Sequence, residues 1–118
     1  MRLTEELRDR SKHFASGIIQ IYTKLPKQRE EVAIIGKQML RSGTSVASHA
    51  REASRGRSNA EFISKLGGLL QEADETQLWI EFLIEDCSIN SPNLTSLHRE
   101  AGELIAIFTT IIHKVKSA

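Results

Sequence analysis

Apolar residues recur along this chain at alternating steps of three and four, which places them on one face of an α-helix. Four such blocks follow one another, and only short polar segments separate them. They predict helices over about residues 4–25, 29–55, 59–89 and 92–116. No stretch shows the strict alternation of apolar and polar residues that a half-buried strand requires.

The residues at the block boundaries are those that begin and end helices. Pro26 ends the first block, because the residue before a proline is pushed out of the helical region. Ser58 and Glu61 have the spacing of a capping box at the start of the third block. Ser91–Pro92 combines an N-cap serine with a proline in the first turn of the fourth. Gly56 is a C-terminal stop for the second.

Connections of only a few residues force successive helices to run antiparallel. The sequence therefore predicts an all-α fold, an antiparallel up-down-up-down four-helix bundle that forms a single domain over residues 1–118. The third helix has an unbroken heptad seam, formed by Phe62, Leu66, Leu69, Ala73, Thr76, Ile80, Leu83 and Cys87.

The last two helices carry more apolar residues than one seam requires. Trp79 and Phe82 lie off the seam of the third helix, and an exposed apolar patch usually marks a contact with another chain. The second helix offers a small-residue surface around Gly43 and Ala47, within a segment of thirteen residues (41–53) of which seven are Gly, Ala or Ser. We expect these four residues at or near a contact between copies of the chain. Burial in the core of one chain is the alternative for Trp79 and Phe82.

The charges are unevenly distributed although the formal net charge is only +1. Residues 1–65 contain 13 Lys or Arg against 7 Asp or Glu, whereas residues 66–98 contain 6 acids and no Lys or Arg. We therefore expect an electrically polarised molecule. The composition, 40% hydrophobic and 26% charged, excludes a disordered chain, and no apolar run approaches the roughly 20 residues that span a bilayer.

Five basic residues gather around the end of the second helix and the start of the third. Guanidinium groups bind phosphate oxygens in pairs, so this cluster predicts sequence-independent binding of RNA or DNA. No aromatic residue is interleaved, and base stacking is therefore not expected. The alternative is that these cations form ion pairs within a helix or between subunits, for example Arg51 with acids of the third helix. The five predicted contacts are Arg41, Arg51, Arg55, Arg57 and Lys65.

The sequence offers no recognisable catalytic or metal-binding motif. No acidic residue lies three positions before any of the four histidines, as di-metal bundles require, and no nucleotide-binding glycine loop or nucleophile elbow is present. Gly67–Gly68 falls within a helix, where a close packing contact explains it best. Cys87 is the only cysteine and has no partner for a disulfide. We expect a cytoplasmic protein that is not an enzyme and has no metal, cofactor or membrane partner.

Several segments between about Phe14 and Phe108 form a specific pattern together, namely Tyr22–Pro26, Gln38–Val46, Arg51–Ala53, Glu61–Leu66 and Gln71–Trp79. In this pattern the chain resembles the four-helix-bundle family encoded by intervening sequences of bacterial 23S ribosomal RNA genes. The resemblance implies a ring-like homopentamer. A related branch of the family comprises the accessory proteins of diversity-generating retroelements, which bind nucleic acid and a reverse transcriptase. Gly67–Gly68 departs from the pattern, which has larger helix-forming residues there.

The leading hypothesis is therefore a non-enzymatic, homo-oligomeric protein that binds structured RNA or DNA, with five-fold repetition of a basic patch strengthening the binding by avidity. The alternative is a protein-interaction scaffold, or an accessory protein of a reverse transcriptase. Neither hypothesis requires a cofactor.

Overall fold

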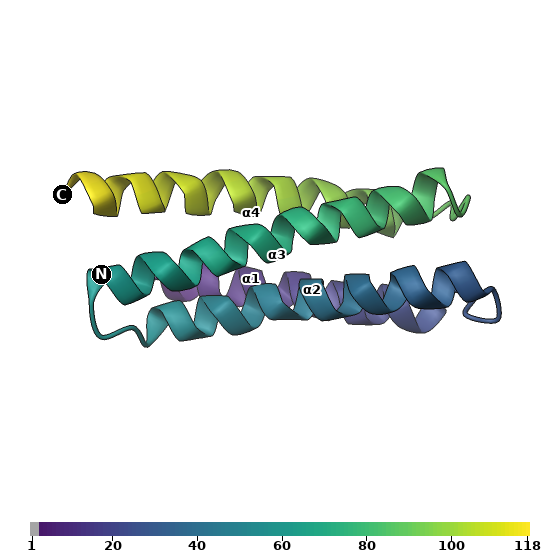
Figure 1. Cartoon of the computed structure of the whole chain (residues 1–118), viewed down its shortest axis with the longest axis horizontal. Helices are drawn as coiled ribbons and strands as arrows, with labels where there is room; N and C mark the ends of the chain where they lie inside the picture. Colours follow the sequence, from purple (N-terminus) through teal and green to yellow (C-terminus); the bar gives the residue numbers. More distant parts are fainter. Residues whose placement is uncertain (1–2) are drawn as a thin grey trace.

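A computed structural model describes residues 3–118 as four antiparallel α-helices (Figure 1), which confirms the predicted bundle. No strand occurs in this part of the chain. The first, second and fourth helices begin and end within one residue of the predicted positions, but the third ends four residues early. The helices are α1 (Glu5–Lys24), α2 (Glu30–Ser54), α3 (Asn59–Glu85) and α4 (Pro92–Ser117).

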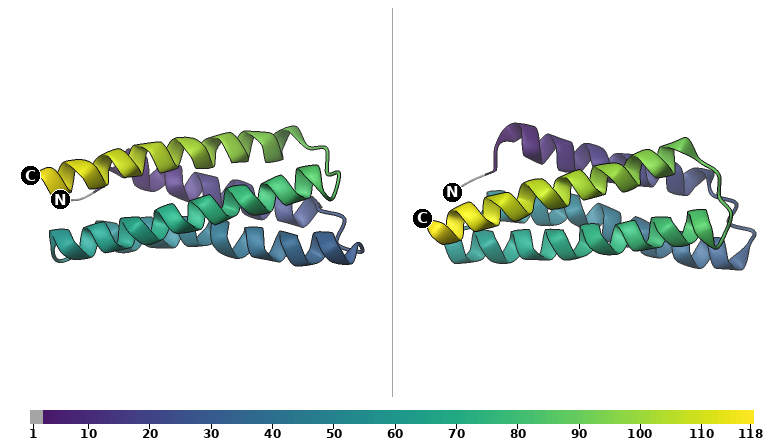
Figure 2. Two further views of the ribbon diagram at one scale, coloured as in Figure 1. Left: turned by 45° about the horizontal axis from the view of Figure 1, so that its top comes forward. Right: turned by 90° about the horizontal axis from the view of Figure 1, so that it is seen from above.

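Each helix packs against its neighbours in the sequence, and α4 closes the bundle against α1. The contact between α2 and α3 is the most extensive and that between α1 and α4 the smallest. The bundle is a rod of 48 × 20 × 19 Å, in which α1 begins and α4 ends at the same end (Figure 2). Short connections produce this order, because they place each helix antiparallel beside the next one along the chain.

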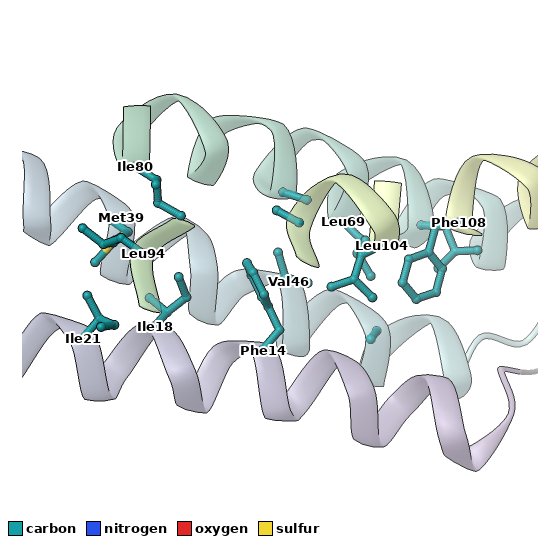
Figure 3. Packing of buried hydrophobic residues seen from close by; sticks show 14 of the residues in the cluster. Phe14, Ile18, Ile21, Met39, Val46, Leu69, Ile80, Leu94, Leu104 and Phe108 are labelled. Carbon is teal, nitrogen blue, oxygen red and sulfur yellow. The ribbon is translucent and has the colours of Figure 1, made fainter. Parts of the chain in front are cut away.

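The core follows the predicted seams. Side chains from all four helices point into the middle of the bundle, where Phe14, Val46 and Leu104 come from three of them (Figure 3). Burying each large apolar side chain contributes about 1.5–3 kcal/mol. The predicted seam of α3 is buried at all eight positions, Phe62, Leu66, Leu69, Ala73, Thr76, Ile80, Leu83 and Cys87. Several apolar residues off the seams, among them Ile63, Leu70, Ile84, Ile105 and Ile112, pack half-buried against this core.

Polar contacts also tie the helices together, as two examples show. The hydroxyl groups of Ser42 on α2 and Thr76 on α3 are hydrogen-bonded in the core, with their oxygens 2.8 Å apart. A buried polar pair must keep its partner, so this bond favours one register of α2 against α3. Between α1 and α4, Arg10 donates hydrogen bonds of 2.7 and 2.8 Å to Glu100 and one of 3.0 Å to Glu103. The bonds to Glu100 raise the pKa of Arg10.

The helix caps largely confirm the sequence analysis. Ser58 and Ser91 each accept a hydrogen bond from the backbone amide three residues later, and Pro92 lies in the first turn of α4. Gly56 follows the end of α2 as expected, but its φ is not positive. Its small size matters instead, because a Cβ there would lie 3.2 Å from the carbonyl oxygen of Ala53.

The early end of α3 is a correction to the predicted range of 59–89. Ser88 has a left-handed backbone with φ of 57°, which turns the chain out of the helix. The amide of Ile89 then donates to the carbonyl oxygen of Leu83 at 2.9 Å. Arg29, from the connection between α1 and α2, donates a hydrogen bond of 2.9 Å to the carbonyl oxygen of Cys87. The sequence gives no warning of this turn, because glycine is the usual residue there.

Replacing Ser88 by glycine should stabilise the protein. A Cβ is unfavourable in the left-handed region, so we expect S88G to raise the free energy of unfolding by about 0.5–1 kcal/mol. Thermal unfolding followed by circular dichroism measures this. S88A keeps the Cβ and should show no such gain, and a lower melting temperature for S88G would contradict the explanation.

The paired glycines of α3 differ in their surroundings. A Cβ on Gly68 would lie 2.9 Å from Cε1 of His49, so the expected close packing contact is confirmed for this residue. A Cβ on Gly67 would meet nothing within 4 Å, so the same expectation is wrong for Gly67.

These two positions should therefore respond differently to alanine. G67A should raise the free energy of unfolding by about 1 kcal/mol, because glycine is a poor helix former and the site is open. G68A should gain less or lose stability, because its methyl group must displace the His49 ring. When His49 is first replaced by alanine, the ring no longer stands in the way. The double variant H49A/G68A should therefore be more stable than H49A by about the amount that G67A gains over the unchanged protein. Equal gains from G67A and G68A in chemical denaturation would contradict this reading.

Candidate nucleic-acid interface

A groove of about 870 Å³ lies between the first half of α1 and the second half of α2. Its walls carry four cationic side chains, Arg8 and Lys12 from α1, Arg51 from α2 and Arg55 from the C-terminal cap of α2. We call this feature the basic groove. Its floor is formed by short side chains, which include Ala15, Ser16, Ala47 and Ser48.

The groove exists because α1 and α2 pack closely. A Cβ on Gly43 would lie 2.8 Å from both Cγ atoms of Ile18, so only glycine allows α1 to lie where it does. A Cβ on Gly36 would lie 2.9 Å from the Leu25 side chain. Small residues on the outer side of this contact leave a hollow, and the long basic side chains rise on either side of it.

The helix register brings the four cations together. The contact of Gly43 with Ile18 places the two helices side by side, and because they are antiparallel, Arg51 lies at a level between Arg8 and Lys12. Within each helix the two cations are four residues apart, which is about 6 Å along the axis. The groove thus presents two cations from each wall over less than two helical turns.

These cations are not neutralised by neighbouring acids. None of the four forms an ion pair with another residue of the described range 3–118. Asp9 is the single acidic residue among those that line the basic groove in this range. Unpaired cations around a concave surface concentrate a positive potential there, which attracts polyanions.

The five basic residues predicted from the sequence do not form one surface. Arg51 and Arg55 line the basic groove, but Arg41 reaches α3, where it pairs with Glu75 at 3.2 Å and Glu72 at 3.6 Å. Lys65 pairs with Glu52 at 3.5 Å, and Arg57 is exposed in the connection between α2 and α3. On the sequence alone, Arg51 is the example of a cation paired with acids of the third helix. In the structure Arg41 makes such pairs, and Arg51 makes none with a described residue.

Sequence reasoning missed Arg8 and Lys12. Both lie on the first helix, at least 29 residues before the predicted cluster, and a search by proximity along the chain does not join them to it. A signal does exist, because Arg8 and Lys12 share the spacing of four residues with Arg51 and Arg55, and small residues follow them at Ala15 and Ser16.

The four residues expected at a contact between copies have different surroundings. Gly43 is buried against Ile18, so its small size is already used within the chain. Ala47 lies on the floor of the basic groove. Trp79 and Phe82 are half-buried, with ring centroids 6.0 Å apart, and Trp79 also packs against the core. An interface role stays a prediction for all four residues.

Exposed apolar side chains lie near this aromatic pair. Leu78, one turn before Phe82, is 43% exposed, and Ile34 of α2 is 56% exposed. The register set by Ser42 and Thr76 brings Ile34 to the same end of the α2–α3 pair. We call Ile34, Leu78, Trp79 and Phe82 the apolar patch.

The remaining polar clusters are small. His49 Nδ1 lies 3.2 Å from Glu52 Oε1, and His98 Nε2 lies 2.8 Å from Glu81 Oε2. Within residues 3–118 no three His, Cys, Asp or Glu side chains are grouped so that they could hold a metal ion. None of the described helices combines the length and the apolar character needed to cross a membrane.

Comparison with known proteins adds a family. Residues 5–110 match the profile of the 23S rRNA-intervening sequence protein family. Among solved structures, the chain is similar to the crystal structure of a protein of unknown function from the S23 ribosomal protein family of Bacteroides thetaiotaomicron, with 36% sequence identity and a TM-score of 0.81. That match covers 90% of this chain and 97% of the other. No curated protein matches the sequence.

Proposed function

We propose that this chain, which belongs to the 23S rRNA-intervening sequence protein family, is a non-enzymatic protein that assembles into a homopentamer and binds RNA or DNA through a basic surface. One observation carries the proposal. Four cations from two helices line one groove, and none is paired with an acid of the described chain. Such cations bind phosphate by releasing the counterions that surround a nucleic acid.

The distribution of ion pairs supports a role for the groove over the rest of the predicted cluster. Arg41 and Lys65 already have acidic partners, which phosphate would have to displace. Arg51 and Arg55 have none among residues 3–118. We therefore place the main contacts at Arg51 and Arg55, with Arg57 as an accessory cation at the end of α2.

Binding should depend strongly on salt and on the unpaired arginines. We expect the protein to bind structured RNA and duplex DNA at low salt, with an affinity that falls as salt rises. Removing two phosphate contacts in R51Q/R55Q should weaken binding and lower the slope of log K against log salt by about two per chain. Fluorescence anisotropy across a salt series measures both quantities.

The matched control is R41Q, which removes one cation that is already paired with Glu72 and Glu75. It should leave the affinity and the salt slope nearly unchanged. Absence of binding at low salt, or binding that does not respond to salt, would overturn the proposed function.

The apolar patch supports self-association. Exposed apolar side chains of α2 and α3 lie at the same end of this helix pair as the aromatic pair. Two different faces that meet head to tail can close into a ring. Five copies would repeat the basic groove five times and raise the affinity for a long polyanion by avidity.

Light scattering should give a mass about five times the 13.2 kDa of one chain. Because Trp79 is half-buried, W79E should separate the two possible roles of the side chain. Dissociation into helical monomers would place Trp79 at the contact between copies, whereas loss of helicity by circular dichroism would place it in the core. Glu85 is exposed, so E85Q is a control that should change neither the mass of the assembly nor its helicity. A monodisperse monomer at micromolar concentration would contradict the assembly and favour a protein partner, such as a reverse transcriptase, for the apolar patch.

A further inference from the structure

We infer that the basic groove holds a chain of phosphates and leaves the bases of a nucleic acid outside. The inference rests on the proposed function and adds which part of the ligand is recognised. It also moves part of the recognition to Arg8 and Lys12, which lie on a helix that the sequence did not implicate.

The arrangement of the cations suits a linear phosphate chain. Each wall presents two cationic residues whose positions differ by about 6 Å along the helix axis, a separation comparable to that of neighbouring phosphates in an extended strand. Because Arg51 lies at a level between Arg8 and Lys12, one phosphate can contact cations from both walls. Arginine can hold such a phosphate with two parallel hydrogen bonds.

Beside the apolar side chains of Ala15, Ile19 and Ala47, the lining of the groove offers hydroxyl groups. Hydroxyl groups in helices often donate to the carbonyl oxygen of the preceding turn, as Ser45 does to Arg41 at 2.8 Å. Ser16 and Ser48 form no hydrogen bond with any described residue, so their hydroxyl groups can donate to phosphate oxygens. These groups and the four cations complete a surface that matches phosphate oxygens.

The lining lacks the side chains that stack on bases or pair with adenine edges. No aromatic side chain is among the residues of range 3–118 that line the groove, so bases have no platform on which to stack. No Asn or Gln lines it either, and these are the side chains that pair with adenine edges. The groove is thus suited to recognising phosphates by their charge and spacing.

Asp9 distinguishes this site from any other basic surface of the molecule. Its carboxylate lines the groove without an ion pair to a described residue, so it repels a bound phosphate. Replacing it by asparagine removes that repulsion and should tighten binding by about threefold at low salt. A ligand bound elsewhere on the molecule would not sense this change.

The experiment compares a normal oligonucleotide with an abasic strand of equal length, using fluorescence anisotropy on the full chain. Both should bind with affinities within about twofold of each other, and D9N should tighten both. R8Q/K12Q should weaken both by at least tenfold. The control for D9N is D74N, which changes the net charge equally but lies on the exposed face of α3. The control for R8Q/K12Q is K37Q, which removes an exposed cation outside the groove. Neither control should move the affinity by more than about twofold. Circular dichroism checks that each variant keeps its helices.

A competition with inorganic polyphosphate identifies the source of the phosphate chain. Displacement of the oligonucleotide at equal phosphate concentration supports recognition of phosphate alone, and failure to displace it overturns the inference. Loss of more than tenfold in affinity for the abasic strand also overturns it, because the bases would then contribute.

The remaining outcomes separate this inference from the proposed function. Binding that ignores the changes at Arg8, Lys12 and Asp9 would leave the proposed function standing and overturn the groove as its site. Binding of polyphosphate without binding of any oligonucleotide would support the phosphate-chain site and overturn the proposed nucleic-acid function. Binding of neither would overturn both.

Discussion

The contact between α1 and α2 at Gly43 determines where most of the other features lie. Ile18 is fully buried and β-branched, so it has little freedom to move away from a side chain at position 43. The absence of a side chain there lets the two helices approach, and Gly36 repeats the arrangement against Leu25. The same approach sets which residues of α1 face which residues of α2. Both the depth of the basic groove and the grouping of its cations follow from it.

The charge asymmetry of the sequence becomes a spatial division in the folded chain. Acids of α3 and α4 are paired across helix boundaries, Glu72 and Glu75 with Arg41, and Glu100 and Glu103 with Arg10. These pairs leave Arg8, Lys12, Arg51 and Arg55 without acidic partners among the described residues. Exposed ion pairs contribute little to stability. Their larger effect here is to leave one groove with unbalanced positive charge.

Small residues in the second helix serve two purposes. Gly43, Ala50 and Ala53 are buried and allow close packing within the chain, whereas Ala47 and Ser48 form part of the groove floor. The hydrogen bond between Ser42 and Thr76 holds the other side of the same helix against α3. α2 is therefore fixed on both flanks, which makes it a rigid base for Arg51 and Arg55. A rigid surface loses less entropy when it binds a ligand.

The sequence by itself determined the four helices, their order and the residues that face the core, because apolar periodicity and capping depend on residues within a few turns of one another. The seam of α3 and the caps at Ser58 and Ser91 are examples. It also pointed to Arg51 and Arg55. Only the tertiary structure decided that Arg41 and Lys65 have acidic partners, that Arg8 and Lys12 join the site, and that α3 ends at Glu85. The ion pairs and the grouping of cations depend on which residues of separate helices lie at the same level. The end of α3 depends on a left-handed turn at Ser88. Local sequence does not encode either, because both are set by packing between segments that are distant along the chain.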